Sequence, residues 1–223
     1  MSPCSRLAGT AVMGRAGNLY LARAQGGAGM TTRSKAIETR YKGYRFRSRL
    51  EARWAVFMDS LGIRWEYERE GFDLGGVGYL PDFWLPELRM WVEVKAEKPS
   101  FNGEEWKKAD LLVDYQGWPV CIFFGVPELD HGGIGIRDDS SDSGGGRGYD
   151  DPICWVRCRS CGQFTVTLGD DRHDVVDKDW GIWRESACCN HEQNWEYFNI
   201  LLKEAVESAR GARFEFGESG PPR

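Results

Sequence analysis

Three charged side chains, Asp82, Glu93 and Lys95, lie in segments that otherwise have the aromatic and β-branched composition of core strands, YLPDFWL (79–85) and MWVEVKA (90–96). Burying a charge is costly unless it is paired or bound to a metal. Glu93 and Lys95 are two residues apart, so on a strand they share one face. If the two strands are neighbours, Asp82 lies beside Glu93, and a divalent cation would relieve the repulsion between the carboxylates. The pattern predicts a Mg²⁺ (or Mn²⁺) site, with Lys95 positioning or deprotonating an attacking water.

The elements that must position these side chains follow a regular order. A helix is predicted over SRLEARWAVFMDSLG, where Leu50, Trp54, Phe57 and Leu61 recur at helical spacing and Gly62 ends the run. Two more segments are predicted as strands, IRWEYE (63–68) and the apolar PVCIFFGV (119–126), with a turn at GFDLGGVG between the first strand and YLPDFWL.

A second helix is predicted between the third and fourth strands, in NGEEWKKADLLVDYQG. Asn102 and Glu105 have the spacing of a capping box, and Gly117 is the expected stop. A helical crossover predicts that the fourth strand adds in parallel. The order is therefore helix, three strands, helix, strand, which indicates an α/β fold.

The Pro-Asp pair, the ten residues after it and the following Glu-x-Lys resemble the signature of the PD-(D/E)XK nuclease superfamily. The resemblance covers about residues 40 to 127 and implies a restriction-endonuclease-like αβββαβ core with a mixed sheet. It also implies Mg²⁺-dependent hydrolysis of DNA phosphodiester bonds, leaving 5′-phosphate and 3′-hydroxyl ends, as in phage or mobile-element DNA processing. Members often carry an acidic residue on the first helix, and Glu51 occupies that place.

Other interpretations of the same residues stay open. Asp82, Glu93 and Lys95 could form an ion-pair ladder on a half-exposed sheet of a structural protein. Ser48 and Glu51 also have the spacing of a capping box, which requires no chemistry of Glu51. A nuclease-like fold that binds nucleic acid without cleaving it is the alternative function.

Basic residues are concentrated before and within the first predicted helix. Between Met30 and Val56 there are eight Lys or Arg and two Glu, although the whole chain has a net charge of -5. Such side chains contact phosphates without reading sequence. The predicted DNA contacts are Lys42, Arg45, Arg47, Arg49 and Arg53.

Five of the seven cysteines fall between residues 154 and 189. The pairs Cys158-x₂-Cys161 and Cys188-x₂-His191 have the spacing of zinc ligands, and Cys154, Cys189 and His173 are substitutes. A structural Zn²⁺ in a reducing compartment is therefore favoured over a disulfide framework, and small buried cysteines are the alternative.

The chain divides by composition into five parts. These are an N-terminal extension (1–39, with Met30 as an alternative start), a nuclease core (40–128), a flexible Gly/Ser/Asp-rich linker (129–152), a Cys-rich zinc-ribbon-like segment (153–192) and a C-terminal amphipathic helix with a tail (193–223). We expect a cytoplasmic protein with no membrane contact, since no apolar run approaches the length of a membrane span. DNA is the expected partner, and a two-fold symmetric substrate would favour a homodimer.

Overall fold

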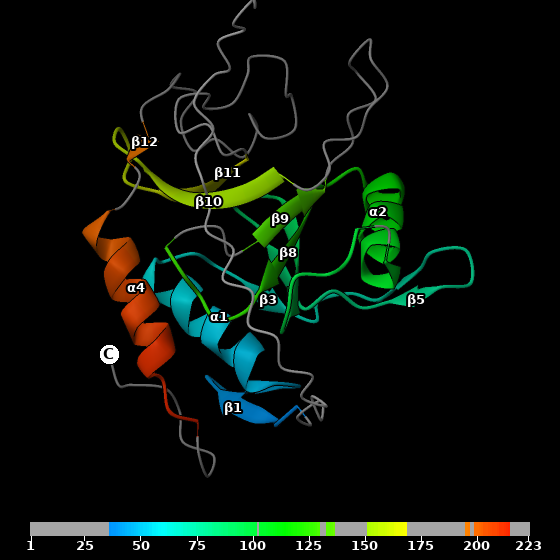
Figure 1. Ribbon diagram of the computed structural model, residues 1–223, viewed down its shortest axis with the longest axis horizontal. Coiled ribbons are helices and arrows are strands. Elements are labelled where there is room, and N and C mark those ends of the chain that lie inside the picture. The colour runs from blue at the N-terminus through cyan, green and yellow to red at the C-terminus, as the bar shows by residue number, and fades with distance from the viewer. Residues whose placement is uncertain are drawn as a thin grey trace, which may run out of the picture. The chain divides into compact units, whose positions relative to one another are not determined.

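A mixed β-sheet organises the part of the chain that the structure describes, which in this computed structural model is residues 36–101, 103–129, 133–136, 151–168, 195–196 and 199–214. The sheet has eight strands in the order β11-β10-β9-β8-β7-β6-β3, with β12 paired to β10 (Figure 1). Its strands are β3 (Glu66–Tyr67), β6 (Phe83–Leu85), β7 (Met90–Lys95), β8 (Val120–Phe124), β9 (Gly133–Ile136), β10 (Asp151–Cys158), β11 (Phe164–Leu168) and β12 (Trp195–Glu196). The fold is therefore mixed α/β.

The register around β7 decides where the charged residues lie. Strand β6 pairs antiparallel to β7 with Phe83 opposite Val92, and β7 pairs parallel to β8 with Val92 opposite Cys121. The predicted parallel addition of the fourth strand is confirmed. Extending the β6–β7 register by one residue sets Asp82 opposite Glu93.

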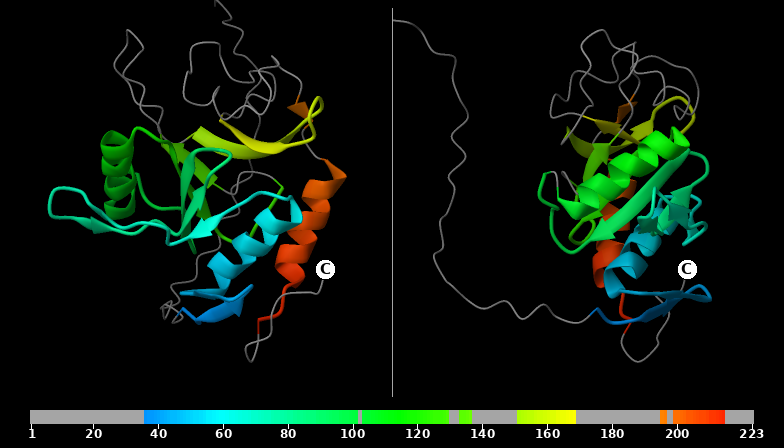
Figure 2. Two further views of the ribbon diagram at one scale, coloured as in Figure 1. Left: turned by 180° about the vertical axis from the view of Figure 1, so that it is seen from behind. Right: turned by 90° about the vertical axis from the view of Figure 1, so that its right-hand side faces the viewer.

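Helices cover both faces of this sheet. The three described helices are α1 (Arg49–Ser60), α2 (Glu104–Gln116) and α4 (Ile200–Gly211). Helices α1 and α4 pack together on one face, and α2 packs on the other (Figures 1 and 2). Along β7, Val92 and Val94 belong to the core under α1 and α4, whereas Trp91 belongs to the core under α2. This alternation follows from the two-residue period of a strand.

The ends of α1 and α2 follow from local sequence. Ser48 caps α1 by accepting a hydrogen bond from the Glu51 amide at 3.1 Å. Gly117 ends α2 in the left-handed conformation, with φ 70° and its N–H bonded to Val113 O, as predicted. The capping box predicted at the start of α2 differs: the N-cap is Gly103, which has no side chain, and Asn102 lies outside the described residues.

Two short hairpins flank the main sheet. Strands β1 (Thr39–Tyr41) and β2 (Tyr44–Phe46) pair antiparallel before α1. Strands β4 (Phe72–Asp73) and β5 (Gly78–Tyr79) form a second hairpin between β3 and β6, in the segment where the sequence predicts a turn. Residues 74–77 between them supply the actual turn, with positive φ at Gly75 and Gly76.

The C-terminal half differs from the prediction in two places. Residues 133–136, expected within a flexible linker, form β9 between β8 and β10. The C-terminal helix, expected from about residue 192, begins at Ile200 because the Asn199 side chain caps it by accepting from the Leu201 amide at 2.7 Å. Residues 195–196 are strand β12 instead. None of the described helices combines the length and apolar character needed to cross a membrane.

Candidate functional site

Three buried carboxylates come together where α1, β6 and β7 meet. Glu51, Asp82 and Glu93 are 7%, 2% and 6% exposed, and no other acidic residue in the described ranges is buried. They are the three acids that the sequence predicts. This degree of burial does not fit a ladder on a half-exposed sheet, because such a ladder would leave at least Glu93 in solvent.

Asp82 uses its two carboxylate oxygens differently. Oδ2 accepts the Val94 backbone N–H at 2.7 Å, a bond from the neighbouring strand that fixes the side chain just before β6 begins. Oδ1 accepts from Nη2 of Arg47 at 2.6 Å. Arg47 therefore joins the acidic centre, although the sequence predicts it only as a DNA contact.

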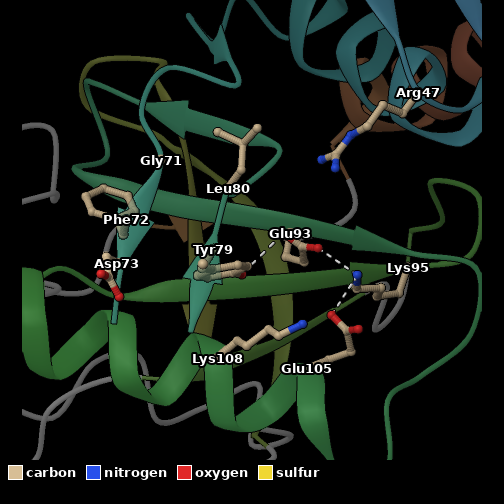
Figure 3. Close-up of a pocket in the computed structure, with 11 residues that line it drawn as sticks. Arg47, Gly71, Phe72, Asp73, Tyr79, Leu80, Glu93, Lys95, Glu105 and Lys108 are labelled. Atoms are coloured by element: carbon tan, nitrogen blue, oxygen red, sulfur yellow. Dashed lines mark hydrogen bonds and ion pairs between the residues drawn. The ribbon is translucent and has the colours of Figure 1, made fainter. Parts of the chain in front are cut away.

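Glu93 is held by a tyrosine and a lysine. Its Oε2 accepts the Tyr79 hydroxyl at 3.2 Å, and its Oε1 forms an ion pair with Nζ of Lys95 at 2.7 Å (Figure 3). The same ammonium contacts Oε2 of Glu105 on α2, also at 2.7 Å. Lys95 therefore bridges β7 and α2 beside the acids.

Glu51 combines the two roles that the sequence leaves open. Its amide and its Oε1 both bond the Ser48 hydroxyl, at 3.1 and 2.7 Å, as expected of a helix-capping residue. Its Oε2 accepts from the Arg47 N–H at 3.1 Å and from the Tyr67 hydroxyl at 2.6 Å. The Glu51 carboxylate also lies close enough to Asp82 to raise the pKa of that residue.

Burial and mutual repulsion shift the pKa values of the centre upward. Burial raises the pKa of Asp82 well above its ordinary value, and the charges of Glu93 and Glu51 raise it further. Burial also raises the pKa of Glu93, although Lys95 opposes the shift. Burial lowers the pKa of Lys95, but Glu93 and Glu105 outweigh it, so that pKa is raised and the amine stays charged. In the absence of other cations, the centre therefore tends to keep a proton.

A pocket of about 630 Å³ opens beside the acids. Its walls are the β4–β5 hairpin, β7 and the first turns of α2, with Arg47 on one side (Figure 3). Glu93, Lys95, Glu105 and Lys108 all line it. A phosphate-bearing ligand in this pocket would meet Lys95, Lys108 and Arg47 together.

Asp82 and Glu93 supply carboxylate oxygens, the type of ligand that hard divalent cations take. Asp82 Oδ1 and Glu93 Oε1 each face a side-chain cation, Arg47 or Lys95, so the fold already places positive charge at these two oxygens. In the part of the chain that the structure describes, no three His, Cys, Asp or Glu side chains are arranged to hold a metal. A cation held by Asp82 and Glu93 would keep several waters, as Mg²⁺ usually does.

Most of the predicted DNA contacts already have acidic partners. Lys42 pairs with Asp59 at 2.7 Å, Arg45 pairs with Glu38, and Arg47 pairs with Asp82 as described above. The other two, Arg49 and Arg53, are half-buried on α1, and their Nε atoms have no hydrogen-bond partner among the described residues. These five side chains therefore do not form one unpaired basic surface.

The predicted zinc ligands are described only in part. Cys158 is buried at the end of β10, and Cys161 is exposed in the turn that follows. The backbone bonds Gly162 N–H to Cys158 O and Cys158 N–H to Gln163 O, both at 2.8 Å, close a tight turn there. Cys188, Cys189, His191 and His173 lie outside the described residues, and Cys154 lies on β10.

Sequence reasoning missed Tyr79 and Glu105 as members of the site. Tyr79 lies three residues before Asp82, and its burial at 7% exposure follows from the β4–β5 hairpin. Glu105 reaches Lys95 only because α2 packs over β7, a tertiary contact with no local signal.

The chain was compared with protein-family models, with curated proteins and with solved structures, and no family model, curated protein or solved structure matches it.

Proposed function

We propose that this protein is a metal-dependent endonuclease that hydrolyses DNA phosphodiester bonds, with a restriction-endonuclease-like core. The observation that carries the proposal is the meeting of two buried carboxylates, Asp82 and Glu93, from adjacent strands, with the Lys95 ammonium 2.7 Å from Glu93. Buried ionisable groups with shifted pKa values cluster at functional sites, because catalysis and metal binding need such groups.

The order of the elements supports the finer description of the fold. Apart from the inserted β4–β5 hairpin, the chain runs α1, β3, β6, β7, α2 and β8. This is the αβββαβ order implied by the resemblance to the PD-(D/E)XK superfamily. Asp82 precedes the second of these strands, and Glu93 and Lys95 lie on the third.

Each residue of the centre has a proposed task. Asp82 and Glu93 would hold Mg²⁺ or Mn²⁺, with Glu51 assisting directly or through water. When bound, the cation would supply charge neutralisation at the phosphate and a more acidic water. Lys95 would orient the attacking water and stabilise charge on the phosphate, while Glu105 and Glu93 hold the ammonium in place.

A panel of DNA substrates tests the proposal. Duplex, nicked, branched and single-stranded labelled DNAs are incubated with the protein and Mg²⁺ or Mn²⁺. We expect shortened strands with 5′-phosphate ends, loss of cleavage in Asp82→Asn and Lys95→Ala, and retained DNA binding in both. Glu97→Gln and Lys107→Ala, exposed charges near the site, are the matched controls and should cleave normally.

Two results would contradict the proposal. If Asp82→Asn or Lys95→Ala still cleaves DNA, the catalytic role assigned to that residue is wrong. DNA binding with no cleavage under any divalent cation favours the alternative, a nucleic-acid-binding protein with this fold.

The proposed structural Zn²⁺ at Cys158, Cys161, Cys188 and His191 is tested separately, by metal analysis of the purified protein and of a Cys158→Ser variant.

A further inference from the structure

Arg47 contacts two of the three buried acids and a third, partly exposed acid beside them. Its Nη2 contacts Asp82 Oδ1 at 2.6 Å, its Nε contacts Glu68 Oε1 at 2.7 Å, and its backbone N–H donates to Glu51 Oε2 at 3.1 Å. The backbone of Arg47 is therefore fixed at the start of α1, whereas the guanidinium rests on two carboxylates. Its side chain is 53% exposed, while that of Asp82 is 3% exposed.

The bond to Asp82 falls on the oxygen that a cation would need. Asp82 Oδ2 already accepts the Val94 amide, which belongs to the strand geometry. Oδ1 is the oxygen left for a metal, and the guanidinium holds it. A guanidinium and a divalent cation both bind carboxylate oxygens through charge, so they compete for this atom.

Lys95 differs from Arg47 in this respect. Its ammonium lies between Glu93 and Glu105, and its side chain is 28% exposed, so it remains held by Glu105 if Glu93 turns to another ligand. Arg47 has a second partner, Glu68, which is not one of the three buried acids, and it borders the pocket. Its guanidinium can leave Asp82 without leaving the site.

We propose that Arg47 is an internal counter-ion of Asp82 that a divalent cation displaces, and that the freed guanidinium then binds a phosphate oxygen of the substrate in the adjoining pocket. The inference rests on the proposed function. A planar guanidinium matches phosphate through paired hydrogen bonds, which suits it to both positions. Because metal and phosphate then favour the same Arg47 position, each raises the affinity of the protein for the other.

Calorimetry of Mn²⁺ binding without DNA tests the competition. The full chain is titrated at about pH 8, where protons compete less for the carboxylates. Arg47→Ala and Arg47→Gln should bind Mn²⁺ about three- to tenfold more tightly than the parent, the range expected when a partly exposed ion pair no longer has to be broken. Arg64→Ala, which removes an exposed arginine paired with Glu87, is the control and should leave the affinity unchanged.

A second measurement tests whether the freed Arg47 guanidinium binds a DNA phosphate. Binding of labelled duplex DNA to the parent is measured with and without Ca²⁺, another oxygen-seeking cation. We expect Ca²⁺ to raise the DNA affinity of the parent and to raise that of Arg47→Gln by a smaller factor. The control, Arg64→Ala, should show the same Ca²⁺-dependent gain in DNA affinity as the parent. Circular dichroism confirms that each variant is folded, and the glutamine variant serves if the alanine variant does not fold.

The outcomes separate this inference from the function on which it rests. If the parent binds Mn²⁺ and the Arg47 variants bind it equally or more weakly, Arg47 merely supports the site, and the inference fails while the proposed nuclease stands. If Arg47→Gln keeps the full Ca²⁺-dependent gain in DNA affinity, the transfer to phosphate fails. If the parent binds no divalent cation, both proposals fall.

Discussion

The three buried acids differ in how the protein neutralises them. Asp82 faces a guanidinium, Glu93 faces an ammonium, and Glu51 is bonded by hydroxyl and amide donors. Of these, Asp82 is the most buried, and its pKa is raised by burial and by the other two acids. Its ionisation is therefore the most costly step in preparing the centre for a cation.

Replacing Asp82 should change how stability depends on pH. A carboxyl whose pKa is higher in the folded state takes up a proton on folding, so the free energy of unfolding falls as pH rises from the unfolded value near 3.8 toward the raised folded value. In a buffer that contains a metal chelator, the Asp82→Asn variant should not show this loss. Its free energy of unfolding should exceed that of the parent by roughly 1 to 3 kcal/mol at about pH 8. At about pH 3, below both the unfolded and the folded pKa of Asp82, the gain should nearly vanish.

Melting temperatures over this pH range check the prediction. The control is Glu97→Gln, an exposed acid two residues after Lys95, whose curve should follow the parent. A gain that is equally large at both ends of the range would mean that the introduced amide improves packing and that ionisation of Asp82 plays no part.

Tyr79 should matter more for activity than for stability. Its hydroxyl donates to Glu93, and one such bond contributes about 1 kcal/mol. Tyr79→Phe should lower the cleavage rate several-fold by freeing one Glu93 oxygen, with a melting temperature close to that of the parent. The control is Tyr115→Phe on the exposed side of α2. An unchanged cleavage rate in Tyr79→Phe would show that Lys95 alone orients Glu93.

At the level of elements, one residue hydrogen-bonds to both the helix and the strand that carry the site. Gly125, with φ 68°, donates its N–H to Lys95 O at 2.9 Å and accepts the Trp54 indole N–H at 3.0 Å. Trp54 lies one turn after Glu51 on α1 and stacks on Phe123 of β8. This contact therefore adds to the core packing that sets the position of α1 relative to β7.

Trp54→Phe should loosen that connection. It removes the donor to Gly125 and leaves a small cavity, which together should cost about 1 to 3 kcal/mol of unfolding free energy. We expect cleavage to fall further than this loss of stability explains when measured well below the melting temperature, because Glu51 and Lys95 are no longer held at a fixed separation. Chemical denaturation and single-turnover cleavage are compared with Trp118→Phe, a half-buried tryptophan outside this contact. Equal effects in the two variants would reject the role of Gly125.

Sequence patterns located the elements with strong local signals. The spacing of Leu50, Trp54 and Phe57 predicted α1, and the apolar segment at 119–126 predicted β8, which is parallel to β7 as expected. The Gly-Ile-Gly-Ile stretch of β9 has weak strand propensity and forms a strand between the edges of β8 and β10, so no local signal could find it.

The site was predictable to a similar extent. Asp82, Glu93 and Lys95 could be placed together because strand alternation and antiparallel pairing are short-range rules. The partners Arg47 and Glu105 could not be assigned, because each reaches the centre through packing between distant segments. In both cases the missing information was a tertiary contact between separate elements.

For the whole molecule, ion pairing limits how strongly DNA can be attracted. The net charge is -5, and Lys42, Arg45 and Arg47 already pair with acids. A DNA phosphate that binds one of these side chains would have to replace a protein carboxylate. Such a contact contributes less binding free energy than a contact with an unpaired lysine or arginine. We expect weak binding to non-specific DNA that falls steeply with salt.

Salt titration of DNA binding separates the paired and unpaired basic residues. Arg53→Ala, which removes a side chain whose Nε has no described partner, should reduce the slope of log K against log salt by about one unit if it contacts a phosphate. Arg45→Ala should change the slope less, because its pairing with Glu38 must be given up to bind DNA. Anisotropy with labelled duplex measures both slopes. Identical slopes in the parent and both variants would place DNA on another surface.

The β4–β5 hairpin gives this architecture freedom to diversify. Its strands pair with each other alone among the described strands, yet residues 71–73 and 78–80 form a wall of the pocket. The exposed side chains there, such as Asp73, Val77 and Leu80, can vary without shifting the register that sets Asp82 opposite Glu93. Laboratory selection for new substrate preferences would therefore best begin by randomising these exposed positions while leaving the acids and Tyr79 untouched.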